Sequence, residues 1–250
     1  MSSVRDTFAE RFEASRILYR HGEKQEAKAL LRHLWEAPYR KPIHEFRVFC
    51  ALMEVWCFEN PRAVLGFLES LILGEGDLQA FWARRSLAEQ ACLFEWHGQL
   101  AFATGDDFLA LESLARAASL GRDTSLLWRL LATLHANHGE LDLAVRYCRR
   151  SLNLFKQLEL DILGTHADAL GWFSGEHPLR FESGVEPYMK ILLLVTRLAK
   201  SHRNLRAVRE LLVELIHCFP DEGRLHRIRL MLERSIVESS LTSTAIEAPR

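Results

Sequence analysis

The feature that most constrains the fold is an internal repeat with a period of 34 residues in the middle of the chain. Residues 91–121 and 125–156 carry the same order of aromatic, small, glycine, small and large side chains. The aligned pairs are Phe94 with Trp128, Gly98 with Ala132, Gly105 with Gly139, Ala110 with Ala144, and Leu114 with Cys148. Two antiparallel helices approach closely only where small residues face each other. The glycine ends the first helix, and the large residue fills the remaining space. Because one such hairpin cannot bury its apolar side alone, the repeat predicts stacked hairpins.

The remainder of the chain also has the 3.6-residue apolar period of helices, and no run alternates convincingly as a strand does. The 43 Leu and 26 Ala against 10 Val and 9 Ile favour helix over sheet. Prolines and glycines mark the connections, as in Asn60-Pro61, which is typical of a helix start. The predicted helices cover residues 7–21, 23–36, 43–58, 61–73, 78–103, 106–119, 124–138, 140–156, 158–172, 186–201, 204–218 and 222–237.

Composition excludes several classes of protein. The 32 basic and 33 acidic side chains give a net charge of −1, which removes the usual electrostatic basis for nucleic-acid binding. No apolar run approaches the ~20 residues that span a bilayer, so no membrane insertion is expected. The charged N-terminus does not resemble a signal peptide, and the odd number of cysteines, 5, suits reduced core thiols. These features predict a cytoplasmic protein.

The segment Trp128 to Ala144, Trp-Arg-Leu-Leu-Ala-Thr-Leu-His-Ala-Asn-His-Gly-Glu-Leu-Asp-Leu-Ala, resembles a tetratricopeptide repeat, and residues 91–121 resemble the unit before it. Degenerate units are recognisable near residues 8–38, 43–74 and 188–220. The resemblance implies an all-α fold, a right-handed α-solenoid of about 12 helices arranged as antiparallel hairpins. We expect one domain over residues 1–238 with a capping helix at 222–237, and a disordered tail at 239–250.

Tetratricopeptide-repeat proteins mostly bind other proteins, in a concave groove formed by the first helix of each hairpin. The resemblance therefore implies a non-enzymatic scaffold or adaptor, with a cytoplasmic chaperone as a variant of this interpretation. The Lys–Asn pairing of the chaperone-binding members is absent here. Homo-oligomerisation is compatible with the sequence but not indicated by it. The groove-facing positions that the matching units imply are Phe12, Arg16, Tyr19, Glu95, Gln99, Phe102, Arg129, Thr133, Asn137 and Lys200.

Charge is distributed in blocks along the chain. The net charge is −5 over residues 60–113, +4 over 114–156, −4 over 157–177 and +4 over 178–234. A stripe of basic residues recurs every third position across one predicted helix–turn–helix, and such a stripe is either a solvated face or a patch for an acidic partner. Its members are Arg197, Lys200, Arg203, Arg206 and Arg209. The alternative function is a structural subunit of a larger complex, docking through the convex face or this 197–209 stripe.

Motifs of catalysis or cofactor binding are not evident, so no cofactor is predicted. Gly171-Trp-Phe-Ser174-Gly175 has its serine one place late for a nucleophile elbow, and no strand precedes it. His135 and His138, with His166 and Asp168 one hairpin further on, have the residue types of a metal site. Packing and turn positions account for the first two histidines, so no metal is predicted. An enzyme therefore ranks last among the functional hypotheses.

Overall fold

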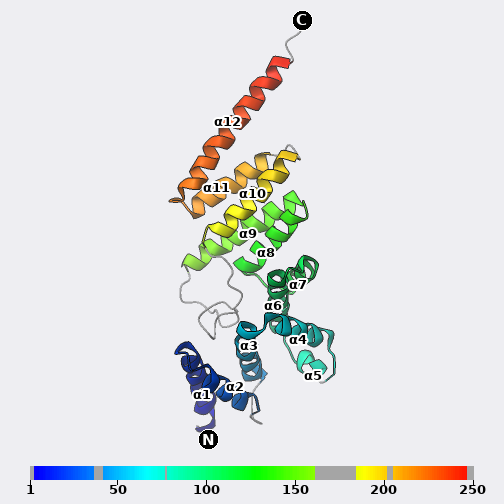
Figure 1. Cartoon of the computed structure of the whole chain (residues 1–250), viewed down its shortest axis with the longest axis vertical. Helices are drawn as coiled ribbons and strands as arrows, with labels where there is room; N and C mark the ends of the chain where they lie inside the picture. The colour runs from blue at the N-terminus through cyan, green and yellow to red at the C-terminus, as the bar shows by residue number, and fades with distance from the viewer. Residues whose placement is uncertain (1–2, 37–41, 77, 161–183, 202–204, 247–250) are drawn as a thin grey trace. The chain divides into compact units, whose positions relative to one another are not determined.

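A computed structural model describes residues 3–36, 42–76, 78–160, 184–201 and 205–246, and these residues form an all-α protein (Figure 1). This part of the chain contains twelve helices. Their bounds are α1 Ser3–Arg20, α2 Lys24–Glu36, α3 Pro42–Glu59, α4 Pro61–Leu73, α5 Leu78–Ala83, α6 Leu87–Thr104, α7 Asp107–Ser119, α8 Ser125–Asn137, α9 Leu141–Leu160, α10 Glu186–Ser201, α11 Leu205–Cys218 and α12 Gly223–Ile246. The chain divides into two compact units, one containing α1–α7 and the other α8–α12.

Local sequence signals set several helix boundaries. Asn60 caps α4, because its side-chain oxygen accepts a hydrogen bond from the Ala63 backbone N–H at 3.1 Å. Gly105 ends α6 in the left-handed conformation, at φ +88°, where a residue with a side chain would be strained. These boundaries follow the turn residues that the sequence provides, as predicted.

In the first unit, the N-terminal helices pack as neighbouring hairpins. The ring centroids of Phe8 and His44 lie 3.9 Å apart, and those of Tyr19 and Phe58 lie 6.3 Å apart, so α1 and α3 run in the same direction. Lys28 forms an ion pair with Glu59, whereas Trp35 near the end of α2 contacts Phe49, so α2 runs antiparallel to α3. Helices α1, α2 and α3 therefore pack as neighbours, with α2 antiparallel to α3.

The α6–α7 hairpin has the close approach that the repeat predicts. A Cβ atom placed on Gly98 of α6 would lie 2.6 Å from Cγ of Leu114 on α7, so only glycine fits at this crossing. Leu114 is fully buried, as are Ala110 and Ala117 on the same side of α7. The close approach of the two helices at a small residue is therefore confirmed, but the residue opposite Gly98 is the large Leu114 and not another small one.

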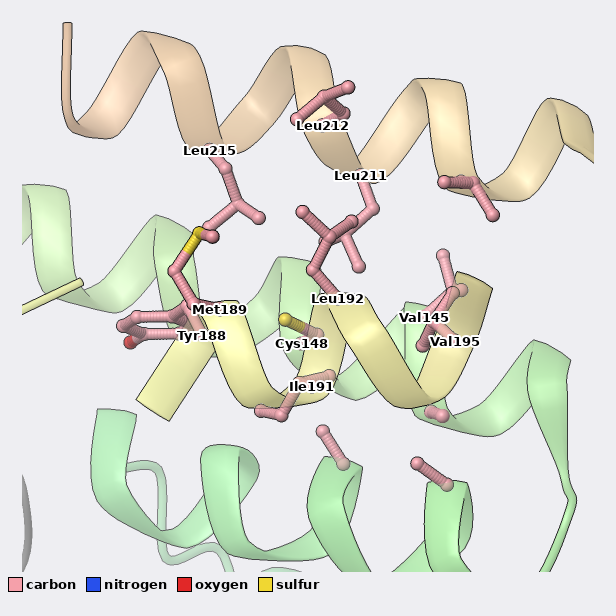
Figure 2. Packing of buried hydrophobic residues seen from close by; sticks show 14 of the residues in the cluster. Val145, Cys148, Tyr188, Met189, Ile191, Leu192, Val195, Leu211, Leu212 and Leu215 are labelled. Atoms are coloured by element: carbon pink, nitrogen blue, oxygen red, sulfur yellow. The ribbon is translucent and has the colours of Figure 1, made fainter. Parts of the chain in front are cut away.

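In the second unit, two hairpins, α8–α9 and α10–α11, pack on each other. The Ser125 hydroxyl lies 3.2 Å from the Tyr188 hydroxyl at the starts of α8 and α10, and Gly139 after the end of α8 approaches Leu198 near the end of α10. The first helices of the two hairpins are therefore parallel. Figure 2 shows the shared core, with leucines of α11 on one side of α10 and Ile191 on the opposite side.

The structure corrects two boundaries. Residues 78–103 were predicted as one helix but form α5 and α6, because Ser86 and Glu89 make a capping box that starts a new helix. Helix α12 continues to Ile246, so residues 239–246, which were expected to belong to a disordered tail, are helical. Most of the helix predicted at 158–172 lies outside the described residues. None of the described helices is long and apolar enough to cross a membrane.

Candidate partner-binding site

The predicted groove positions of α1 lie mostly in the core of the first unit. Phe12 and Tyr19 are 5% and 7% exposed, and they pack with helices α2 and α3. Arg16 is half-buried and bonds to Glu13 one turn earlier on the same helix. Phe12 and Tyr19 are therefore core residues in the structure and not open groove positions.

The predicted groove positions of α6 are also largely inaccessible. Glu95 and Gln99 are each 3% exposed; Arg122 forms an ion pair with Glu95, and the Gln99 amide donates to Glu95 at 3.3 Å. Both are core positions. The Glu95 carboxylate is paired within the unit, whereas Oε1 of Gln99 is buried without a hydrogen-bond partner among the described residues. Phe102 is half-buried. The repeat pattern does not reveal what covers this side of α6.

The predicted positions of the second unit are more accessible and lie on two adjacent helices. Arg129 and Thr133 are half-buried on α8, while Asn137 on α8 and Lys200 on α10 are exposed. The Arg129 guanidinium carbon lies 6.0 Å from the centre of the Tyr188 ring, which joins the two helices at their N-terminal ends. The structure thus brings these four predicted residues to one pair of parallel helices.

The three predicted residues of α8 lie on a different side of that helix from the rings that contact α9. On α8, Trp128 and His135 contact Tyr147 of α9, so the Arg129–Thr133–Asn137 row points to another side of α8. On α10, the residues packed with α9 are buried, and Lys190, Leu193, Arg197 and Lys200 form the exposed side. We call this surface the basic face, defined by the residues Arg129, Thr133, Asn137, Lys190, Leu193, Arg197 and Lys200.

The basic face has a strongly one-sided charge. Helix α8 contains no acidic residue, and the sole acidic residue of α10, Glu186, binds Arg224 at 2.6 Å. Four cations therefore share the face with the 61% exposed side chain of Leu193. Acidic groups of a partner would be attracted to these cations, and an apolar group would cover the leucine.

The predicted basic stripe is divided by the structure. Arg197 and Lys200 belong to the basic face, whereas Arg206 and Arg209 are exposed on α11. Arg206 donates to Glu210 at 2.9 Å, and Arg203 lies outside the described residues. The described members of the stripe therefore lie on two helices, α10 and α11. On α11, the bond between Arg206 and Glu210 offsets part of the positive charge.

A second candidate site, which the sequence analysis did not identify, lies in the first unit. A cavity of about 640 Å³ opens between α4, α6 and α7, and its lining is mainly apolar. Its floor includes Ile72, Phe94 and Leu109, and the charged side chains Glu69, Glu112 and Arg116 also line it. A cavity of this size is within the range of small-ligand sites.

His97 is the buried polar group beside this cavity. It is 3% exposed, and its Nδ1 lies 2.7 Å from the Ser113 hydroxyl. Its Nε2 is buried and has no hydrogen-bond partner among the described residues. Burial lowers the pKa of His97 to about 4, although Asp106 acts in the opposite direction, so the imidazole is neutral at neutral pH.

Reactive thiols and metal ligands are not grouped in the part of the chain that the structure describes. Burial raises the pKa of the Cys148 thiol, and burial together with Glu54 raises the pKa of Cys57 to about 11. Such thiols are protonated and poor nucleophiles. The described residues contain no cluster of three or more potential metal ligands, while His166, Asp168 and Ser174 lie outside them.

Comparison with known proteins gives no family model, no curated protein and no solved structure that matches the chain.

Proposed function

We propose that the protein is a non-enzymatic scaffold or adaptor that binds an acidic segment of a partner polypeptide on the basic face of α8 and α10. The observation that carries the proposal is the pair of parallel neighbouring helices with three exposed cations on α10, the half-buried Arg129 on α8, and no uncompensated carboxylate on either helix. The parallel arrangement of these first helices, each followed by an antiparallel partner, agrees with the resemblance to tetratricopeptide repeats. A cytoplasmic chaperone would use the same surface.

The chemistry of the face suggests how a partner would be held. Arg197 and Lys200 offer charge to carboxylates, and Asn137 can donate to and accept from a peptide backbone. Leu193 supplies an apolar contact between Lys190 and Arg197. The partner best suited to this surface is an acidic segment with a large apolar side chain among its carboxylates.

The test is affinity capture from the protein's own cell extract, followed by mass spectrometry and by titration with the purified partner. We expect Arg197→Glu combined with Lys200→Glu to weaken the affinity for the partner by about tenfold or more, which corresponds to about 1.4 kcal/mol of binding free energy. The matched control is Arg227→Glu with Arg234→Glu, which changes the charge equally at exposed positions of α12. Equal loss in both double variants, or loss in neither, would reject the basic face as the binding surface.

A further inference from the structure

The cavity between α4, α6 and α7 combines two features that together point to a ligand. One is a mainly apolar space of about 640 Å³, and the other is the buried Nε2 of His97, which has no partner among the described residues. Buried polar atoms without a hydrogen bond are rare in proteins because each loses its contact with water without compensation. We propose that this cavity binds a small, neutral, apolar ligand carrying a hydroxyl group, which forms a hydrogen bond with His97 Nε2.

The bond between His97 and Ser113 explains why a hydroxyl is the suitable group. If the Ser113 hydroxyl donates to Nδ1, then Nε2 carries the proton and needs an acceptor; if Nδ1 donates, Nε2 needs a donor. A hydroxyl can donate or accept, so it satisfies either tautomer. A carbonyl satisfies the first arrangement alone.

The surroundings of the site favour a neutral ligand. His97 itself is uncharged at neutral pH, since burial holds its pKa near 4. Among the side chains that line the cavity, Glu69 and Glu112 outnumber Arg116, so a carboxylate ligand would meet net repulsion. The apolar floor formed by Ile72, Phe94 and Leu109 requires an apolar body, such as an aromatic ring.

Access to Nε2 requires a local rearrangement, because the atom is covered in the structure. The half-buried side chains of Ile72, Phe94 and Leu109 border the open volume, which gives them space to move. Binding would thus give Nε2 of His97 a hydrogen-bond partner, the hydroxyl group of the ligand. This inference concerns the first unit and is independent of the proposed function of the basic face.

The experiment compares p-cresol with toluene, which differ by one hydroxyl. We expect p-cresol to bind the full-length protein about tenfold more tightly in calorimetric titrations. In protein labelled with ¹⁵N-histidine, p-cresol should move the Nε2 resonance of His97, and toluene should move it much less. Equal affinities, no binding of either probe, or an unchanged His97 resonance would overturn the proposal.

Two variants make the test specific. His97→Phe keeps an aromatic ring but removes Nε2, so it should abolish the preference for p-cresol while toluene still binds. Ala115→Trp places a large side chain at an exposed position of the lining and should block both probes. If His97→Phe does not fold, failure of Ala115→Trp to reduce p-cresol binding rejects the site. A second titration asks whether N-acetyl-tyrosinamide displaces p-cresol from the cavity. Displacement would assign the hydroxyl to a tyrosine side chain of a polypeptide, and no displacement would assign it to a free small molecule. Either result supports a ligand that carries a hydroxyl group.

Discussion

Gly98 offers the sharpest test of the packing in the first unit. In the substitution Gly98→Ala, the new Cβ would lie 2.6 Å from Cγ, 2.9 Å from Cδ2 and 3.1 Å from the backbone N of Leu114. Cγ is held close to the backbone, and Leu114 is fully buried, so the side chain cannot simply swing away. Helix α7 must therefore move relative to α6 to accept one methyl group.

The expected cost follows from two opposing effects. Overpacking a tight core costs about 1–3 kcal/mol, and the backbone contact places this site near the upper end. Replacing a glycine inside a helix by alanine raises the free energy of unfolding by about 1 kcal/mol, because the unfolded chain has less backbone entropy. We expect Gly98→Ala to lower the free energy of unfolding by about 2 kcal/mol, measured by urea denaturation followed by circular dichroism.

The same substitution at Gly66 is the matched control. Gly66 lies within α4, and a Cβ there would meet nothing within 4 Å. Gly66→Ala should therefore raise the free energy of unfolding by up to about 1 kcal/mol, because alanine has the higher helix propensity. The reasoning is refuted if Gly98→Ala is as stable as Gly66→Ala, because α6 and α7 would then not be in close contact at this point.

Two further predictions concern buried polar groups of the first unit. Glu45→Gln should lower the free energy of unfolding by about 2 kcal/mol in urea titrations. The fully buried Arg85 side chain loses its 2.6 Å carboxylate partner and keeps the ion pair with Glu89 at 3.6 Å, so the loss is smaller than for an uncompensated buried charge. A loss below about 0.5 kcal/mol would show that the pair is replaceable. Below pH 6.5, His97 takes up a proton in the unfolded chain but not in the folded protein, where its pKa is about 4. The free energy of unfolding should therefore fall as the pH is lowered from 6.5 to 4. In the wild type this fall should be steeper than in His97→Phe, by up to about 1.4 kcal/mol per pH unit. Parallel stability–pH curves for the two proteins would contradict the burial of a neutral imidazole.

Sequence patterns predicted the local architecture well, because helix ends and hairpin seams depend on neighbouring residues. The repeat predicts that α6 and α7 approach closely at small residues, but it does not identify Leu114 as the residue opposite Gly98. The break before α6 could also have been found, since Ser86 and Glu89 have capping-box spacing, but the apolar period continues across it. The length of α12 was underestimated because Ser and Thr were interpreted as a tail, although no glycine or proline interrupts residues 224–246.

Long-range burial could not be predicted in the same way. Glu95 and Gln99 have the polarity of surface residues. The buried carboxylate of Glu95 is paired with Arg122, which follows the end of α7. Similarly, Arg85 is buried because Glu45, 40 positions earlier in the chain, accepts its hydrogen bond. The cavity beside His97 requires three helices to leave a space between them, and no residue pattern on any one helix encodes that space.

The hydroxyl cluster at the start of α8 has a consequence for how the second unit assembles. Ser125 bonds to Ser151, 26 positions along the chain, and also to Tyr188, 63 positions along, so one serine joins both hairpins. Closing the longer loop costs about 0.8 kcal/mol more chain entropy than closing the shorter one, because this cost rises with the logarithm of loop length. Docking of the second hairpin is therefore insensitive to how many residues connect α9 to α10. Length variation in that connection is a change that the two-hairpin core can accept at little thermodynamic cost.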